Sequence, residues 1–199
     1  MAAFEIKYPK GATPLDPDER SGLIPDYITT QGELNALEQE NILEAQQWAL
    51  KKKKNLLKID FVLELHKKMF NQVWKWAGLT RTTDKNIGVQ WDQVTPKLGE
   101  LLANTEYRIE NQPDDLEQII LEFHHKLVAI HAFPNGNGRH ARLITNLLLI
   151  QSGKEPFTWG ASTSTDTIIT EGAIRDDYIT ALQAADNRNY DLLLKFARS

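Results

Sequence analysis

Apolar residues recur along most of this chain at intervals of three and four, which is the spacing of one face of a helix. Polar residues fill the positions between them, so each periodic segment has one face suited to a core and one suited to water. Because these segments all have the helical period, we expect an all-α bundle. The predicted helices cover residues 34–50, 60–73, 94–109, 116–130, 137–150, 171–186 and 189–198.

The first 28 residues show no such period. They contain Pro9, Pro14, Pro17 and Pro25, and proline interrupts both helices and strands. We expect an extended arm, residues 1–28, laid over the domain, with a partly disordered tail as the alternative. The remaining residues, 29–199, then form a single domain, which is long enough to bury a full core without disulfides.

Composition narrows the class of protein. Apolar residues make up 41% of the chain, charged residues make up 25%, and the net charge is −4, so no basic face for a nucleic acid is expected. The absence of cysteine excludes a disulfide framework, a thiolate metal site and a cysteine nucleophile. No apolar run is long enough to span a membrane and the start lacks the order of a signal peptide, so a cytoplasmic location without membrane contact is expected. The oligomeric state stays open, a homodimer included.

The stretch IHAFPNGNGRHAR, residues 130–142, connects two of the predicted helices. Gly136 and Gly138 can take positive φ angles at little cost, so successive N–H groups of the loop can converge on one point. The helix that follows adds the free N–H groups and the positive dipole end of its first turn. This layout predicts a phosphate site with a candidate base, His131, beside it.

Two arginines follow the glycines. Arg139 and Arg142 lie about 60° apart around the predicted helix and roughly 4.5 Å apart along its axis. This spacing suits two neighbouring phosphates of one polyphosphate. The other side of the helix is apolar, so the helix can anchor in the core while the arginines face a ligand. That apolar side carries Leu143, Ile144, Leu147 and Leu148.

Residues 131–142 resemble the Fic motif, whose usual form is His-Pro-Phe-x-Asp/Glu-Gly-Asn-Gly-Arg-x-x-Arg. Most Fic enzymes transfer the AMP part of ATP to a hydroxyl side chain of a target protein, and the resemblance implies a Fic-type helical bundle. It also implies that His131 is the general base that takes the proton from that hydroxyl. Gly136, Asn137 and Gly138 would cradle the α-phosphate.

By the same resemblance, Arg139 and Arg142 would hold the β- and γ-phosphates of ATP, and Phe133 would anchor the loop in the core. The chain departs from the motif at Ala132 and Asn135. The family's acidic residue at the fifth motif position binds Mg²⁺, and an amide oxygen is a poorer ligand for this cation. We therefore expect ATP as the substrate and a Mg²⁺ site at Asn135 that the amide weakens.

Residues 36–41, Ala-Leu-Glu-Gln-Glu-Asn, resemble the inhibitory-helix motif Ser/Thr-x-x-x-Glu-Gly/Asn of some Fic proteins, with Ala36 in place of the hydroxyl residue. In those relatives the glutamate pairs with the second motif arginine, here Arg142, and blocks a productive γ-phosphate position. Glu40 and Asn41 are therefore the inhibitory candidates, and an ordinary surface glutamate is the alternative for Glu40. Asn41 also falls within an apolar stripe, so its amide needs a partner.

Trp-Ala-Gly at residues 76–78 resembles the stretch that precedes the flap of Fic proteins. The residues that follow, 81–91, place β-formers around a turn-rich centre and predict a short β-hairpin. In the family, such a flap pairs with the target's backbone and presents its hydroxyl to the base. Ile87, Gly88 and Val89 are the target-positioning candidates, and an ordinary surface hairpin is the alternative.

Over residues 30–198 the chain is most similar to the Fic proteins called mobile mystery protein B. The expected function is that of a protein adenylyltransferase, which moves AMP from ATP to a hydroxyl-bearing target protein under restraint by the inhibitory helix. A Fic-fold nucleotide-binding or interaction module with little or no catalysis is the rival, and Ala132 and Asn135 motivate it. Removal of AMP from a target, with Glu40 as the acidic residue, is a further alternative.

Overall fold

The computed structural model describes residues 6, 13–51, 53–160 and 173–199. Within these residues the chain is helical, and every predicted helix is confirmed with its ends within three residues of the expected positions. Two short 3-10 turns, Trp91–Gln93 and Pro113–Asp115, precede α4 and α5. The α-helices are α1 (Pro17–Arg20), α2 (Gln31–Leu50), α3 (Ile59–Phe70), α4 (Val94–Asn111), α5 (Leu116–Ile130), α6 (Asn137–Gln151), α7 (Ala173–Asp186) and α8 (Asp191–Arg198).

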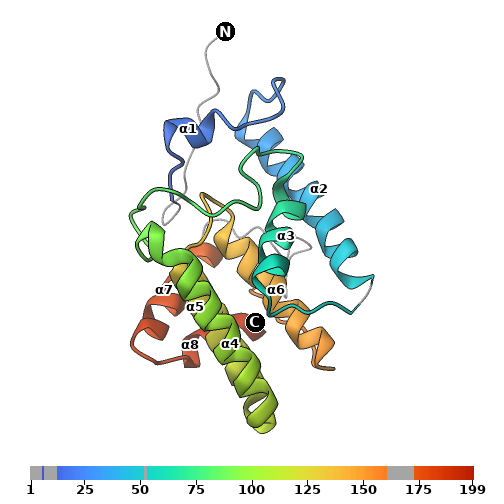
Figure 1. The fold of residues 1–199 in the computed structure, drawn as a ribbon, viewed down its shortest axis with the longest axis vertical. Coiled ribbons are helices and arrows are strands. Elements are labelled where there is room, and N and C mark those ends of the chain that lie inside the picture. The colour runs from blue at the N-terminus through green and yellow to red at the C-terminus, as the bar shows by residue number, and fades with distance from the viewer. Residues whose placement is uncertain (1–5, 7–12, 52, 161–172) are drawn as a thin grey trace.

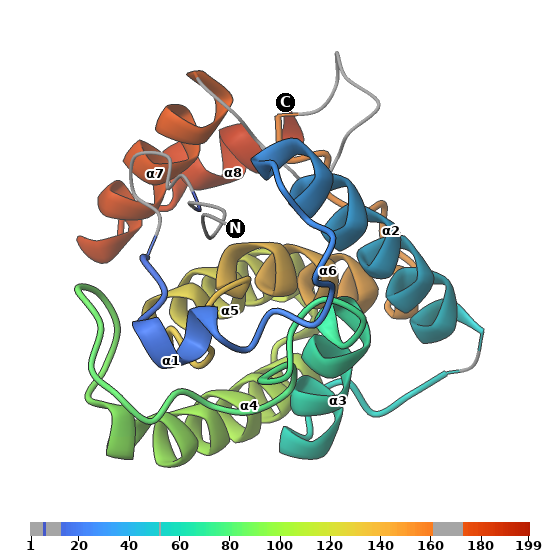
Figure 2. The same cartoon turned by 90° about the horizontal axis from the view of Figure 1, so that it is seen from above.

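The bundle is built around α5 and α6, which pack against each other in the middle of the molecule (Figures 1 and 2). α4 packs on α5, α3 packs on α6, and α2 packs on α3, while α7 and α8 form a pair. The apolar side predicted for the helix 137–150 faces this core, because Leu143, Ile144, Leu147 and Leu148 are all buried. None of the helices in the described ranges is long and apolar enough to cross a membrane.

The buried amide in the apolar stripe of α2 has the partners that its position requires. Asn41 is 1% exposed, and its Nδ2 donates to the carbonyl oxygen of Lys68 at 2.8 Å. Its Oδ1 accepts from the backbone N–H of Gln72 at 3.0 Å. Because these groups lie at the end of α3, Asn41 joins α2 to the C-terminus of its neighbour, which is a structural task.

The N-terminal arm lies against the domain where it is described, but it is not fully extended as predicted. One helical turn, α1, interrupts it, because Asp16 and Glu19 form a capping box and Pro17 suits the first position of a helix. Beyond α1 the arm runs beside the segment after α3, and the backbone N–H of Ile24 donates to the carbonyl oxygen of Val73 at 2.8 Å. Residues 1–5 and 7–12 of the predicted arm lie outside the described residues.

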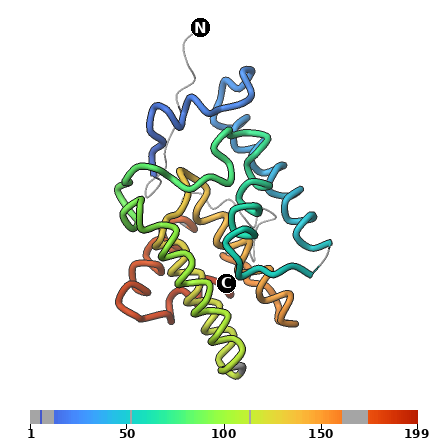
Figure 3. Tube along the Cα trace, viewed as in Figure 1, coloured from blue at the N-terminus to red at the C-terminus, as the bar shows by residue number. Residues whose placement is uncertain are grey.

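The prediction of a short β-hairpin at 81–91 is wrong. The described residues contain no strand there, and the segment between α3 and α4 is an irregular loop, which we call the flap (residues 79–90). Its backbone carbonyls bond to an arginine side chain instead of a partner strand, as described below. Figure 3 shows the flap, α1 and the turn between α5 and α6 at the same end of the bundle.

Candidate active site

The turn between α5 and α6 holds the predicted motif in a fixed conformation. His131 ends α5 in the left-handed region with φ 54°, and its N–H donates to the carbonyl oxygen of Val128 at 3.1 Å. Gly136 caps α6 with φ 78°, and a Cβ atom added there would lie 2.5 Å from the ring of Phe70. Glycine is therefore required at this position for its conformation and for the close approach of the ring.

Side chains inside the turn hold the loop closed. The Asn137 Oδ1 accepts from the N–H of Phe133 at 2.9 Å, and its Nδ2 donates to the Phe133 carbonyl oxygen at 2.8 Å. The His66 ring stacks on the Phe133 ring with centroids 3.6 Å apart, and its Nδ1 accepts from the N–H of Gly78. The His66 Nε2–H therefore donates to the carbonyl oxygen of Asn135 at 3.1 Å. The side chain of Asn137 is committed to the loop, so its contribution to a phosphate site is left to its backbone N–H.

The start of α6, where an anion site is predicted, carries free backbone N–H groups. The N–H groups of Asn137, Gly138 and Arg139 belong to the first turn, where no intrahelical acceptor is available. The dipole of this 15-residue helix adds positive potential at the same end. The turn therefore offers backbone donors to a phosphate group next to His131.

His131 is a buried neutral histidine. It is 6% exposed, and within the described residues neither ring nitrogen has a hydrogen-bond partner. Burial first, and then the positive charges of Arg81 and Lys85, lower the pKa of His131 from 6.5 to about 4. The imidazole is therefore neutral at pH 7 with a lone pair available, which is the state that a general base requires.

A buried arginine that the motif does not include holds His131 in place. The Nε of Arg81 donates to the carbonyl oxygen of His131 at 2.7 Å. Its other nitrogens donate to the carbonyl oxygens of Thr83, at 2.8 Å, and Val89. The Arg81 side chain is fully buried, with a carboxylate of Asp84 3.7 Å away. This one guanidinium thus joins both ends of the flap to the backbone of the candidate base.

The three flap residues predicted to position a target differ in their surroundings. Gly88 lies against the base with φ 105°, and a Cβ atom added there would be 2.7 Å from the Cβ of His131. Val89 is partly buried, and its N–H donates to the carbonyl oxygen of Ile130 at 3.4 Å. Ile87 is 46% exposed. The flap therefore packs on the end of α5 through Gly88 and Val89 and presents Ile87 outward.

The acidic residue that α2 directs to the motif is Glu38. Its Oε2 lies 2.6 Å from the NH1 of Arg139, and its Oε1 accepts from the indole N–H of Trp74 at 2.7 Å. Glu38 is 6% exposed, whereas Glu40 is exposed. The predicted pairing of Glu40 with the second motif arginine is therefore wrong, because Glu40 lies on the outer side of α2 and the observed pair joins Glu38 to the first motif arginine.

The second motif arginine points to the C-terminal helices. Arg142 is 4% exposed, and its guanidinium carbon lies 4.1 Å from the centre of the Tyr178 ring. The Tyr178 hydroxyl lies 2.9 Å from Nε2 of His124, a buried histidine whose pKa burial lowers to about 3. Because His124 is neutral, this hydroxyl can donate to it while accepting from Arg142, with which it also shares a hydrogen bond.

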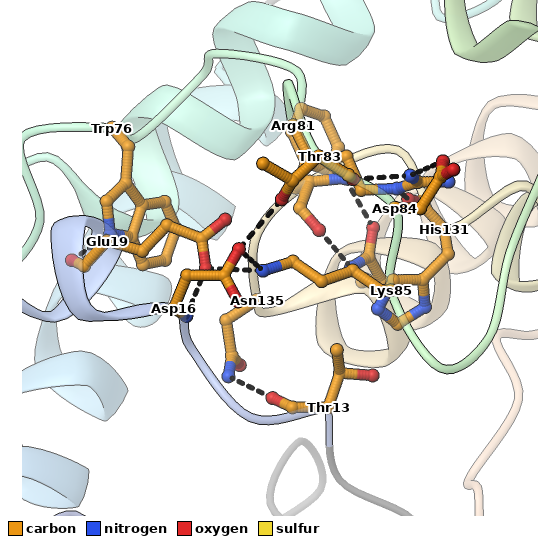
Figure 4. Close-up of polar contacts among 12 residues, drawn as sticks. Thr13, Asp16, Glu19, Trp76, Arg81, Thr83, Asp84, Lys85, His131 and Asn135 are labelled. Atoms are coloured by element: carbon orange, nitrogen blue, oxygen red, sulfur yellow. Dashed lines mark hydrogen bonds and ion pairs between the residues drawn. The ribbon is translucent and has the colours of Figure 1, made fainter. Parts of the chain in front are cut away.

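The side-chain amide of Asn135 has hydrogen-bond partners within the protein (Figure 4). Its Oδ1 accepts from the N–H of Gly136 at 2.6 Å and from the NH2 of Arg139 at 3.3 Å, and its Nδ2 donates to the carbonyl oxygen of Thr13 at 3.5 Å. Among the described residues no group of three or more His, Asp or Glu side chains could hold a metal ion. The residues present therefore do not fit the Mg²⁺ that the motif implies, since the one candidate ligand oxygen already accepts from a cation.

The fold is a helical bundle in which a histidine ends α5 and free N–H groups open α6. Comparison with known proteins shows which family has this arrangement. Residues 56–149 match the model of the Fic/DOC family, which covers α3, the flap, the motif turn and most of α6. Within this segment, which is just under half of the chain, the sequence is similar to that of the Fic/DOC family. The narrower resemblance to mobile mystery protein B stays a prediction.

The similarity extends to curated and solved relatives. The chain is 34% identical over 114 residues to "Protein adenylyltransferase fic-1" of Caenorhabditis elegans, an alignment that covers 54% of this chain and 22% of that protein. It is 29% identical over 153 residues to "Protein adenylyltransferase Fic" of Nematostella vectensis, covering 72% of this chain and 32% of that one. The fold matches the structure of the BepC protein of Bartonella tribocorum, solved with bound AMPPNP, with a TM-score of 0.68, 16% identity and coverage of 92% and 97%. The chain therefore spans about a fifth to a third of the length of these two curated relatives and nearly the whole of the solved BepC chain.

Proposed function

We propose that this chain is a protein adenylyltransferase, which transfers AMP from ATP to a hydroxyl side chain of a target protein. The observation that carries the proposal is the position of a buried neutral imidazole, His131, at the end of α5, where only the turn of residues 132–136 separates it from the N–H groups that open α6. The names of the C. elegans and Nematostella relatives support the same chemistry, and the AMPPNP in the BepC structure supports a nucleotide in a fold of this kind.

In the proposed reaction His131 takes the proton of the target's hydroxyl group as its oxygen attacks the α-phosphorus of ATP. The bond from that phosphorus to the oxygen of the β-phosphate breaks, and pyrophosphate leaves. The N–H groups of Gly138 and its two neighbours stabilise the negative charge on the α-phosphate. Positioning and charge neutralisation supply most of the rate in such a transfer, so no covalent enzyme intermediate is needed.

Arg139 and Arg142 are the proposed ligands of the β- and γ-phosphates. Both project from α6 within one turn of the N–H groups that open the helix. Arg142 is held by Tyr178, whereas Arg139 is 20% exposed and is paired with Glu38. A bound nucleotide must therefore displace Glu38 from Arg139, whereas it can leave the contact of Arg142 with Tyr178 in place.

Because Glu38 must be displaced, we assign the inhibitory role of α2 to Glu38 and not to Glu40. A carboxylate 2.6 Å from Arg139 competes with phosphate oxygens for the same guanidinium. The hydrogen bond from Trp74 keeps the carboxylate aimed at the arginine. Nucleotide binding must therefore break a charge-assisted pair, which weakens the binding of ATP and slows the transfer.

The test uses ATP labelled at either the α- or the γ-phosphate, incubated with a host-cell lysate and the Glu38→Gly variant. We expect a lysate protein to take up label from the α-position only, and the Glu38→Gly/His131→Ala double variant to transfer none. Transfer from the γ-position would indicate phosphorylation and would contradict the proposal.

Two other outcomes would also contradict it. Measurable ATP binding with no label in any lane would favour the rival function, a nucleotide-binding or interaction module. Loss of label from an already labelled target on addition of the wild-type chain would indicate removal of AMP, with Glu38 as the acidic residue.

A further inference from the structure

One buried histidine has no part in the proposed reaction. His124 belongs to α5, and its exposed fraction is 0%. Burial lowers the pKa of His124 from 6.5 to about 3, so the ring is neutral at pH 7. A neutral imidazole donates from one nitrogen and accepts at the other, and a buried ring needs a partner for each. The partners of His124 therefore show which nitrogen carries the proton.

The contacts of Nδ1 decide the question. Nδ1 of His124 lies 3.2 Å from the hydroxyl oxygen of Thr145, a residue of α6. The Thr145 hydroxyl donates its one proton to the carbonyl oxygen of Ala141 at 2.6 Å, so it can only accept from the histidine. The imidazole proton is therefore on Nδ1, and Nε2 carries the lone pair. The ring of Trp159 packs against the imidazole, with the two ring centres 4.4 Å apart, and limits its rotation.

Nε2 faces a tyrosine of α7. The hydroxyl oxygen of Tyr178 lies 2.9 Å from Nε2 of His124, and both side chains are buried. Since Nε2 has no proton, the tyrosine donates its own, and the lone pairs of its oxygen are left to accept. Arg142 is the donor to this oxygen, because the two side chains share a hydrogen bond. The guanidinium carbon lies 4.1 Å from the centre of the tyrosine ring.

These contacts form a closed path through three helices. The path begins on α6 at Thr145, crosses α5 at His124 and α7 at Tyr178, and returns to α6 at Arg142. It lies beside the predicted phosphate site, because a Cβ atom added at Gly138 would be 3.9 Å from the Tyr178 hydroxyl oxygen. A buried network in which each proton has an acceptor holds its members in one arrangement more firmly than separate bonds would.

We propose that Tyr178 and His124 are positioning residues for Arg142, and that they hold its guanidinium ready for the outer phosphates of ATP. The inference rests on the proposed function and adds to it two residues outside the motif. An arginine that is fixed before the nucleotide arrives loses little side-chain freedom on binding, so more of its interaction energy contributes to affinity. The network should therefore favour ATP, which has β- and γ-phosphates, over AMP, which lacks both.

The test compares the affinity of the full chain for ATP and for AMP by isothermal titration calorimetry. Tyr178→Phe keeps the ring beside the guanidinium and removes only the hydroxyl. Because one hydrogen bond to a charged group is lost, we expect the dissociation constant of ATP to rise about tenfold and that of AMP to change by less than about twofold. A general structural defect would weaken the binding of both nucleotides alike.

Tyr190→Phe is the matched control. The Tyr190 hydroxyl lies 3.5 Å from Nδ1 of His125, the histidine next to His124 on α5, and Tyr190 is partly buried as well. The other ring nitrogen of His125 lies 2.8 Å from the carboxylate of Asp186, whose side chain is exposed. This second tyrosine and histidine pair therefore leads to the surface, and its loss should change neither dissociation constant.

His124 is tested through its coupling to Tyr178. His124→Leu removes both ring nitrogens and should weaken ATP binding as much as Tyr178→Phe does. His124→Gln, whose amide can donate and accept, should restore most of the affinity. Because both residues act through one guanidinium, the Tyr178→Phe/His124→Leu double variant should bind ATP no more weakly than either single variant.

Three results would overturn the inference. They are an unchanged ATP dissociation constant in Tyr178→Phe, an equal loss of affinity for ATP and AMP, and additive effects of the two substitutions. Any of these, in a chain that binds ATP and transfers AMP, would leave the proposed function standing. A wild-type chain that binds no ATP would reject both.

Discussion

The Nε of Arg81 donates a hydrogen bond to the carbonyl oxygen of His131 at 2.7 Å, and both residues are buried. The same guanidinium holds the carbonyl oxygens of Thr83 and Val89, so the candidate base and the flap share one support. The left-handed backbone of His131, at φ 54°, is maintained by this contact and by the end of α5. Arg81 is therefore a positioning residue for His131.

Replacement of Arg81 by lysine should lower both stability and activity. A lysine ammonium keeps the charge but lacks the planar fork that reaches three carbonyl groups. With buried carbonyls left unpaired, we expect the free energy of unfolding in urea to fall by about 3 kcal/mol. AMP transfer should fall about a hundredfold through misplacement of His131, with ATP affinity little changed.

Arg108→Lys is the control for this substitution, because Arg108 forms a partly exposed pair with Glu122. Its effect on the free energy of unfolding should stay below about 1 kcal/mol. Equal effects of the two substitutions on stability and transfer would show that Arg81 has no special role.

ATP affinity should respond to Glu38 and not to Glu40. Glu38→Gln keeps an acceptor for Trp74 but removes the charge that holds Arg139, so isothermal titration calorimetry should give an ATP dissociation constant about tenfold lower. Glu40→Gln removes an equal charge from the exposed side of the same helix and should leave the dissociation constant unchanged. A similar tightening in both variants would mean that general charge, and not the buried pair, governs binding.

Asn135→Asp should create the metal dependence that the present residues do not support. The wild-type chain should bind ATP equally well in Mg²⁺ and in EDTA, because the Asn135 amide oxygen already accepts from Gly136 and Arg139. A carboxylate at this position can bind the cation, so the variant should bind ATP more tightly in Mg²⁺ only. Equal tightening in EDTA would remove the argument from metal coordination.

Acid should destabilise the fold through its buried histidines. The pKa of His131 and of His140 is lowered by burial from 6.5 to about 4, that of His124 to about 3, and that of His66 well below its usual value. Below pH 6.5 the unfolded chain therefore binds protons that the folded chain does not, so stability is full above pH 6.5 and is lost as the pH falls toward 4.

At pH 5 this difference costs about 2 kcal/mol for each such histidine. The acidic groups whose pKa the fold lowers, such as Asp16 and Glu122, start from 3.8 and 4.5 and titrate mostly below this window. Urea unfolding at pH 7 and pH 5 measures the effect. The same urea midpoint at pH 7 and at pH 5 would show that the fold does not hold these histidines neutral.

Helix positions follow from the sequence because the period of apolar residues reflects the direction of burial. The same period contains a sign that Glu38 is the inward acid. Glu38 lies four residues after Leu34 and three before Asn41, both of which are buried. Glu40 lies two residues after Glu38, so the step of about 100° per residue places it on the opposite side of the helix. The resemblance to a six-residue motif predicts Glu40 as the inhibitory glutamate, whereas the apolar period favours Glu38 as the glutamate that faces the site.

The supports of the site could not be predicted in this way. Arg81 acts on His131 from 50 residues away, and Lys85 meets Asp16 across 69 residues, both from segments without a regular period. The composition of the flap predicts a hairpin, but its carbonyls bond to a guanidinium that composition does not reveal. Such contacts depend on where irregular loops meet after the helices have packed.

The most direct test of the account is the initial rate of AMP transfer at ATP concentrations well below saturation for the wild-type chain, Glu38→Gln and Glu40→Gln, each with and without His131→Ala. If the buried pair of Glu38 and Arg139 restrains a reaction based on His131, Glu38→Gln should transfer at least about tenfold faster than the other two. All transfer should vanish without His131. Equal rates for Glu38→Gln and Glu40→Gln, or transfer that survives the loss of His131, would contradict it.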